Sequence, residues 1–122
     1  MPTPTRVSRG QLLDFAADVA WRFKAYCAYG ENESTAIRAI RKKCPGFTSR
    51  QYENSFAKAL ELYDAANRLV ADRSAEFWKE HRSGNEKWPH LLDDDLRKLF
   101  PGFRVSTIRS LVGMTFYYWH MR

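Results

Sequence analysis

The residues with the clearest chemical potential in this sequence are basic side chains that flank two copies of a Pro-Gly-Phe string. We call these strings the first PGF corner, Pro45–Phe47, and the second PGF corner, Pro101–Phe103. Arg and Lys side chains on one face can follow the phosphates of a nucleic acid, with an affinity that falls as salt rises. The alternative is that short amphipathic helices expose these side chains to water. The candidate basic residues are Arg38, Arg41, Lys42, Lys43, Arg50, Arg97, Lys98, Arg104 and Arg109.

Aromatic residues near the C-terminus form a second candidate surface. Tyr117, Tyr118 and Trp119 are consecutive in a predicted helix that is apolar on nearly every side. Tyr and Trp are enriched among the residues that dominate protein interfaces. We therefore predict these three as candidate interaction residues. Core burial is favoured for Trp119, whereas Tyr117 and Tyr118 are favoured for contact with another protein or a second copy.

The sequence contains no recognisable catalytic, metal-binding or nucleotide-binding motif. Its three histidines are scattered, and neither Cys27 nor Cys44 lies at ligand spacing from any of them. Asp93, Asp94 and Asp95 are consecutive, but they precede a predicted helix, where carboxylates act as caps. We therefore predict a non-enzymatic protein with no catalytic residues, no metal and no cofactor.

Size and composition indicate a globular protein. The chain has 122 residues, 44% of them hydrophobic and 28% charged, and its net charge of +6 favours acidic partners without identifying them. No apolar run opens the sequence, and the apolar stretch 111–119 is shorter than the roughly 20 residues that cross a bilayer. We predict a cytoplasmic protein that does not enter the membrane. In a reducing compartment its two cysteines would be small buried hydrophobes.

Apolar residues recur at helical spacing along most of the chain. Gly30 is expected to end the first helix, Asn32 or Ser34 to cap the second, and Thr48 with Gln51 to form a capping box at the third. Ser106 is expected to cap the last helix. The predicted helices cover residues 8–29, 33–43, 48–81 with a break near 72–74 possible, about 93–100, and 106–122.

The two PGF corners belong to a longer internal repeat. Residues 40–47 read IRKKCPGF and residues 96–103 read LRKLFPGF, with five identities in eight positions. Each unit predicts a long helix, a glycine loop, a short helix, a PGF corner and another long helix, and the helix that follows the first corner is shared. Phe47 and Phe103 are expected to pack under their corners. The predicted fold is all-α, a single-domain bundle of three long and two short helices over residues 8–122, built from two overlapping helix-PGF-helix repeats, after a disordered segment 1–7.

Two known helical motifs bear comparison with the corners. A helix-turn-helix is disfavoured because Lys42 and Lys98 stand where that motif needs a small or apolar residue. Residues 44–60, CPGFTSRQYENSFAKAL, resemble the loop and second helix of ubiquitin-associated domains, and LFPGF at 99–103 is similar to the Phe-Pro of CUE domains. The likeness covers a small part of the chain and implies a shared corner chemistry, with no function attached.

The absence of a catalytic set and the aromatic last helix together favour one function. We predict a non-enzymatic helical protein-interaction module or small regulatory protein, whose partner is another protein or a second copy. The alternative is a nucleic-acid-binding protein that uses the basic residues around the two PGF corners.

Overall fold

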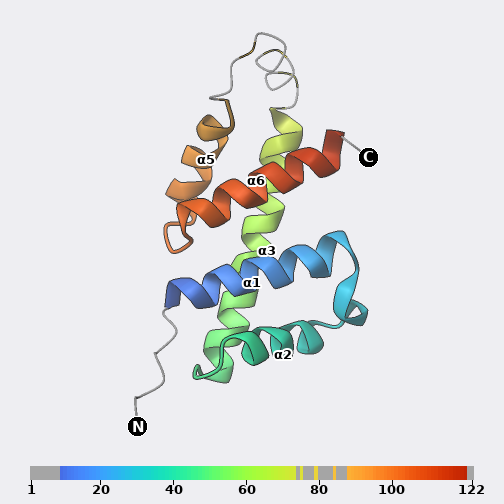
Figure 1. Ribbon diagram of the computed structural model, residues 1–122, viewed down its shortest axis with the longest axis vertical. Helices are drawn as coiled ribbons and strands as arrows, with labels where there is room; N and C mark the ends of the chain where they lie inside the picture. The colour runs from blue at the N-terminus through green and yellow to red at the C-terminus, as the bar shows by residue number, and fades with distance from the viewer. Residues whose placement is uncertain (1–8, 74, 76–78, 80–83, 85–87, 121–122) are drawn as a thin grey trace. The chain divides into compact units, whose positions relative to one another are not determined.

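The computed structural model describes residues 9–73, 75, 79, 84 and 88–120, and these contain no β-strand. This part of the chain is all-α, as predicted, and contains three longer and two shorter α-helices and one 3-10 helix (Figure 1). The elements are α1 (Arg9–Ala25), η1 (Ala28–Glu31), α2 (Glu33–Lys43), α3 (Ser49–Asp72), α5 (Trp88–Leu99) and α6 (Val105–His120).

The chain divides into two compact units. Unit 1 is Met1–Glu61 and unit 2 is Leu62–Arg122, so the boundary falls inside α3. Each unit is described by itself below. The single bundle over residues 8–122 stays a prediction, and the segment 1–7 lies outside the described residues.

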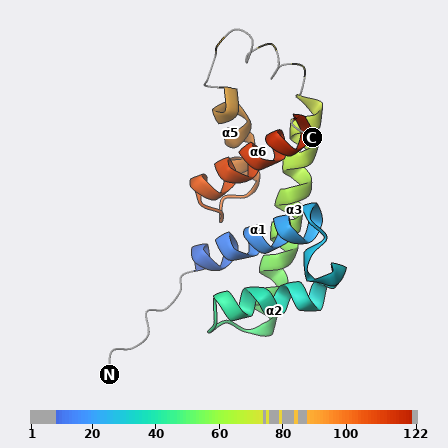
Figure 2. The same cartoon turned by 45° about the vertical axis from the view of Figure 1, so that its right-hand side comes forward.

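Unit 1 is built from α1, α2 and the first half of α3. Helices α1 and α2 contact each other and run side by side in opposite directions (Figures 1 and 2). The rings of Phe23 in α1 and Phe56 in α3 meet edge to face, with their centroids 5.5 Å apart. Aliphatic, aromatic and small side chains from the three helices form the buried core of this unit. It includes Leu12, Ala16, Val19, Ala20, Ala36, Ile40, Tyr52, Phe56 and Ala59.

The link between α1 and α2 differs from the prediction. Helix α1 ends at Ala25 and not near Tyr29, because Cys27 and Tyr29 adopt left-handed backbone conformations, with φ of 53° and 61°. Such conformations are uncommon outside glycine. Gly30 is left-handed too, as expected, but it lies within η1 and not directly after α1. Beyond the helix end, Tyr26 is 66% exposed, although the predicted helix 8–29 would have included it.

Side-chain caps set the starts of α2 and α3. Asn32 Oδ1 accepts a hydrogen bond of 3.2 Å from the Thr35 backbone N–H, which confirms the predicted cap of α2. The Thr48 N–H donates to Gln51 Oε1 at 2.8 Å, and the Gln51 N–H donates to Thr48 Oγ1 at 3.1 Å. This reciprocal pair is the predicted capping box. Helix α3 ends at Asp72, within the predicted break, and most of residues 74–81 lie outside the described part of the chain.

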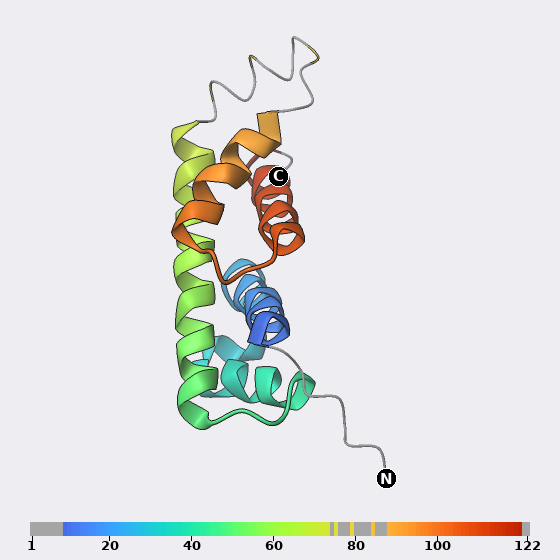
Figure 3. The same cartoon turned by 90° about the vertical axis from the view of Figure 1, so that its left-hand side faces the viewer.

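Unit 2 contains the second half of α3, α5 and α6. Helices α5 and α6 pack against each other (Figures 1 and 3). Helix α5 begins at Trp88 and not near Asp93, since Pro89 is compatible with a first helical turn. Buried residues of this unit include Leu62, Ala66, Val70, Leu96, Phe103, Ile108, Leu111, Val112 and Thr115.

The earlier start of α5 overturns the predicted role of the acidic run 93–95. These residues lie inside the helix and do not cap it. Asp95 Oδ2 pairs with Arg73 Nη1 at 3.4 Å, and Asp94 Oδ1 pairs with Arg97 Nη1 at 3.6 Å. Helix α6 also begins one residue before Ser106, so Ser106 is not its cap. At both starts the residues before the expected cap are already helical, so a residue that often caps helices did not mark where the helix begins.

The two PGF corners share several local features. A residue and its counterpart in the other corner are 56 positions apart, as Ile40 and Leu96 are. In the first corner the N–H of Cys44 donates to the carbonyl oxygen of the buried Ile40 at 2.9 Å. In the second corner the N–H of Phe100 donates to the carbonyl oxygen of the buried Leu96 at 2.8 Å. Further counterparts are buried in both, namely Tyr52 and Ile108, Ser55 and Leu111, Phe56 and Val112, and Ala59 and Thr115.

The corners differ in their glycine and phenylalanine residues. Gly46 has a φ of 105°, which only glycine adopts readily, whereas Gly102 does not have a positive φ. Phe103 is buried, as expected, but Phe47 is only half-buried. The same sequence string therefore turns the chain through different backbone conformations.

Candidate functional site

Tyr52 organises the first PGF corner. Its hydroxyl donates a 2.7 Å hydrogen bond to the carbonyl oxygen of Cys44 and accepts one of 3.2 Å from the N–H of Phe47. The rings of Phe47 and Tyr52 meet edge to face at 6.0 Å. One buried side chain thus satisfies two backbone groups that the turn leaves without helical partners.

Arg41 is the basic residue of this corner that the structure fixes most firmly. Its guanidinium carbon lies 5.1 Å from the centroid of the Tyr52 ring, within the range of a cation–π interaction. Its Nη2 also donates a 2.9 Å hydrogen bond to Ser49 Oγ at the start of α3. Arg41 therefore links the end of α2 to the start of α3, and part of its hydrogen-bonding capacity serves the fold.

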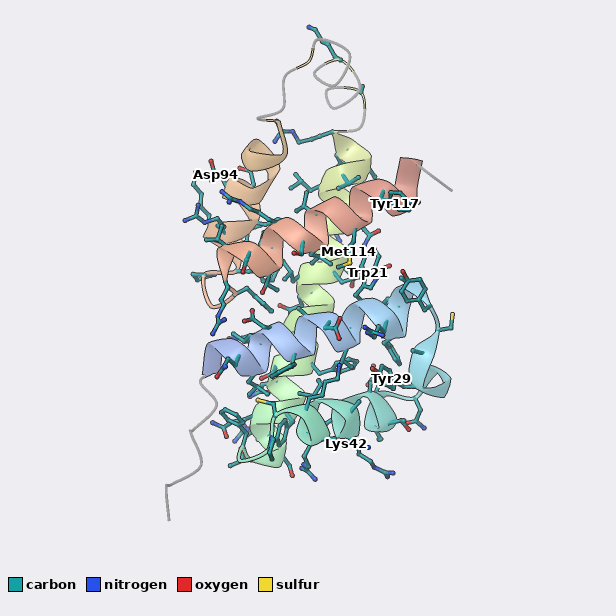
Figure 4. All side chains as sticks on the ribbon, viewed as in Figure 1. Trp21, Tyr29, Lys42, Asp94, Met114 and Tyr117 are labelled. Carbon is teal, nitrogen blue, oxygen red and sulfur yellow. The ribbon has the colours of Figure 1, made fainter. Side chains whose placement is uncertain are left out.

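The other predicted basic residues of unit 1 fall into two groups. Lys43 Nζ pairs with Asp18 Oδ2 at 3.3 Å, and the same oxygen accepts from Arg22 Nε at 3.2 Å. Arg38, Lys42 and Arg50 are exposed, and within the described part of the chain they make no ion pair or hydrogen bond (Figure 4 labels Lys42). Among the predicted basic residues of unit 1, these three are the most available to an anionic partner.

The basic residues of the second corner have acidic neighbours. Arg97 pairs with Asp94, and Asp95 follows on the same helix. Lys98, Arg104 and Arg109 are exposed. The five basic candidates around the first corner lie in unit 1 and the four around the second lie in unit 2, so their union into one face stays a prediction.

The predicted aromatic surface is only partly within the described side chains. Tyr117 is 66% exposed, as favoured for an interaction residue. Tyr118 and Trp119 belong to α6, but their side chains lie outside the described part of the structure. Figure 4 shows Tyr117 and Met114 on the later part of α6.

Two further exposed apolar side chains of unit 2 were missed by the sequence analysis. Leu99 is 69% exposed and Met114 is 38% exposed. Their counterparts in the first unit are Lys43 and Lys58, both exposed, and the counterpart of Tyr117 is the exposed Glu61. The aligned strings 40–47 and 96–103 already contain the exchange of Lys43 for Leu99, and the same spacing of 56 residues gives the exchanges at Met114 and Tyr117.

The cysteines differ in environment. Cys44 is buried, and desolvation by its surroundings raises the pKa of its thiol, which keeps it protonated and unreactive. Cys27 is exposed, so the prediction that it is a buried hydrophobe is wrong. The reason is the early end of α1, which leaves Cys27 in the link to α2.

Across the residues that the structure describes, no three His, Cys, Asp or Glu side chains are grouped so that they could hold a metal ion. The same part of the chain holds no helix with the length and apolar character of a membrane span. Comparison with known proteins found no family model, no curated protein and no solved structure that matches this chain.

Proposed function

We propose that this chain is a non-enzymatic, cytoplasmic protein-interaction module, and that it binds its partner through exposed apolar side chains of unit 2. The observation that carries the proposal is the exchange of Lys58 for Met114 and of Glu61 for Tyr117 at corresponding exposed positions. Large apolar side chains in water gain free energy when a partner covers them.

The comparison between the units rests on a proposed duplication. We infer that the chain consists of two overlapping helix-PGF-helix repeats that share α3. The corresponding backbone hydrogen bonds at Cys44 and Phe100 and the shared burial of Ile40 and Leu96 support this inference. Positions that are exposed in both repeats can then be compared directly. At these positions the first repeat carries charged residues where the second carries Met114 and Tyr117.

The chemistry of the exchanged residues fits a protein partner. Met and Tyr are both enriched at protein interfaces relative to the rest of the surface. The Met side chain adapts to irregular surfaces, and the Tyr side chain offers a large ring with a polar tip. Because Met114 and Tyr117 are three residues apart on one helix, they lie on the same side of α6.

A pull-down with matched variants tests the proposal. The variant M114K/Y117E gives unit 2 the residues that unit 1 carries at the corresponding positions, and K58E/E61K is the control that alters those exposed positions of unit 1. We expect cell proteins retained by the immobilised wild type and by the control to be lost from M114K/Y117E. Identical sets of retained proteins for all three would contradict the proposal, provided that their circular dichroism spectra agree.

A second candidate function has its own observation. Arg38, Lys42 and Arg50 of unit 1 are exposed and make no ion pair or hydrogen bond to any residue that the structure describes. Such cations can release counterions from a phosphate backbone. Binding to duplex DNA and to RNA should then weaken as salt rises, and R38A/K42A/R50A should lower the slope. No binding at about 50 mM salt, or a slope unchanged by the triple variant, removes this candidate.

A further inference from the structure

The outward side of α6 changes character along its length. The exposed residues on this side are Ser106, Arg109, Ser110, Gly113, Met114 and Tyr117. They follow the spacing of three and four residues that defines one side of a helix. The described residues in the first half of this side are polar. In the second half they are Gly113 and the apolar side chains of Met114 and Tyr117.

Gly113 lies on this exposed side and has open space around it among the described residues. A Cβ atom added at Gly113 would meet no atom of the described residues within 4 Å, and the counterpart in the first repeat is the exposed Ala57. Glycine inside an exposed helix is less stable than alanine because it loses more backbone entropy on folding. Packing among the described residues of unit 2 therefore gives no reason for glycine at this position. A partner whose backbone approaches α6 closely would give one.

A second copy of the same helix fits this side when the two helices are antiparallel. Arg109 and Tyr117 lie four residues before and four residues after Gly113. In an antiparallel pair centred on Gly113, Arg109 of each copy therefore faces Tyr117 of the other. A guanidinium over a tyrosine ring is an attractive cation–π pair, and twofold symmetry forms it twice.

A parallel pairing of the same sides is disfavoured by charge. It would place Arg109 against Arg109 of the second copy, and two like charges in contact repel each other. It would also leave each Tyr117 ring without a cation. The side of α6 is thus complementary to itself in the antiparallel orientation, which favours a second copy as the occupant.

We propose that the chain forms a homodimer through antiparallel pairing of the α6 helices, with Gly113 at the twofold axis and Arg109 of each copy stacked on Tyr117 of the other. This inference rests on the proposed function, because it uses the same exposed residues of unit 2. It adds the identity of the partner and the geometry of the contact.

The decisive experiment is sedimentation equilibrium of the full chain over a range of concentrations, with a reducing agent present because Cys27 is exposed. We expect a reversible monomer–dimer equilibrium for the wild type. Tyr117→Arg should raise the dimer dissociation constant by about tenfold or more, which corresponds to about 1.4 kcal/mol. The control Glu61→Arg, at the corresponding position of the first repeat, should leave the dissociation constant unchanged.

A charge-swap variant tests the direction of pairing. R109E/Y117R restores an attractive pair in the antiparallel dimer, because the carboxylate introduced at position 109 would face the guanidinium introduced at position 117 of the second copy. A parallel dimer would instead bring identical charges together. Recovery of dimerisation relative to Tyr117→Arg supports the proposal, and a dissociation constant that stays as weak overturns it. Positions 109 and 117 are more than two helical turns apart, which prevents their pairing within one helix.

The homodimer and the broader proposed function fail in different ways. A wild-type chain that remains monomeric at every concentration overturns the homodimer. The pull-down with M114K/Y117E then still decides whether a different protein binds unit 2. Equal melting temperatures of the wild type and the α6 variants at low concentration show that a loss of dimer is not a loss of fold.

Discussion

The hydroxyl of Tyr52 lies 2.7 Å from the carbonyl oxygen of Cys44, and this hydrogen bond closes the first PGF corner. The same hydroxyl accepts the N–H of Phe47, so a single buried side chain holds the backbone on both sides of Pro45 and Gly46. In the second corner the counterpart is Ile108, which has no polar atom in its side chain. The two corners therefore differ in the interactions that hold them as well as in their backbone conformations.

Tyr52→Phe should destabilise the protein. The ring is kept, but the Cys44 carbonyl and the Phe47 N–H both lose their partner, and a buried group left unsatisfied costs about 1–3 kcal/mol. Urea unfolding measures this change in the free energy of unfolding. Tyr26→Phe is the matched control, because Tyr26 is 66% exposed and its loss of a hydroxyl should change stability by less than about 0.5 kcal/mol. Equal effects of the two substitutions would contradict the assigned role of Tyr52.

Thr48→Ala should weaken the start of α3. The substitution removes the Oγ1 acceptor of the Gln51 N–H, and loss of such a cap costs about 0.5–2 kcal/mol. Thermal unfolding followed by circular dichroism reports the change. Ser106→Ala provides the contrast, because Ser106 lies inside α6 and does not cap it. A destabilisation by Ser106→Ala as large as that by Thr48→Ala would show that the assigned start of α6 is wrong.

Gly113→Ala should have opposite effects on folding and on self-association. In a monomer measured at low concentration, alanine should raise the free energy of unfolding by about 0.5–1 kcal/mol, because the added Cβ meets open space. At the proposed twofold axis the same Cβ should hold the helices apart and weaken the dimer. The reciprocal variant Ala57→Gly should lower monomer stability by a similar amount without affecting dimerisation. A more stable monomer with unchanged dimerisation would exclude Gly113 from the contact.

The two cysteines should differ in reactivity toward a thiol reagent. Exposed Cys27 should react at once in the folded protein, whereas buried Cys44 should react only at the rate at which the protein opens. Comparison of Cys27→Ser and Cys44→Ala assigns each phase. A rapid reaction at both positions in the folded protein would contradict the burial of Cys44.

The raised pKa of Cys44 also predicts a pH dependence of stability. Burial raises the pKa of the folded thiol above its ordinary value of 9.0, so the unfolded chain ionises first as the pH increases. The contribution of Cys44 to stability is therefore fully present below the unfolded pKa and is lost as the pH rises through the folded pKa. Urea unfolding between about pH 7 and 10 should show a smaller decline for Cys44→Ala than for the wild type. Parallel declines would remove this assignment.

Local sequence determined the parts of this protein that depend on short-range hydrogen bonds. The bounds of α2, the Asn32 cap and the Thr48–Gln51 capping box follow from residues three or four positions apart, which interact whatever surrounds them. Local patterns did not predict the start of a helix correctly where the residues before a capping residue could also be helical. Asp93–Asp95 and Ser106 resembled caps, but Pro89 and Val105 were already compatible with helix.

Tertiary packing decided which side chains face solvent and which charges pair. The sequence placed Arg41 among nine equivalent cations, but packing of α2 against the start of α3 put it over the Tyr52 ring, and packing in unit 2 brought Asp95 to Arg73. Spacing marks the sides of a helix without saying which side its neighbours will cover. For α6, packing in unit 2 buried Ile108, Leu111 and Val112 and left Met114 and Tyr117 exposed. The sequence alone thus predicted an all-helical chain with repeated corners and Tyr117 as an interaction residue, and the packed structure added Met114 as an exposed apolar neighbour of Tyr117 on the same side of α6.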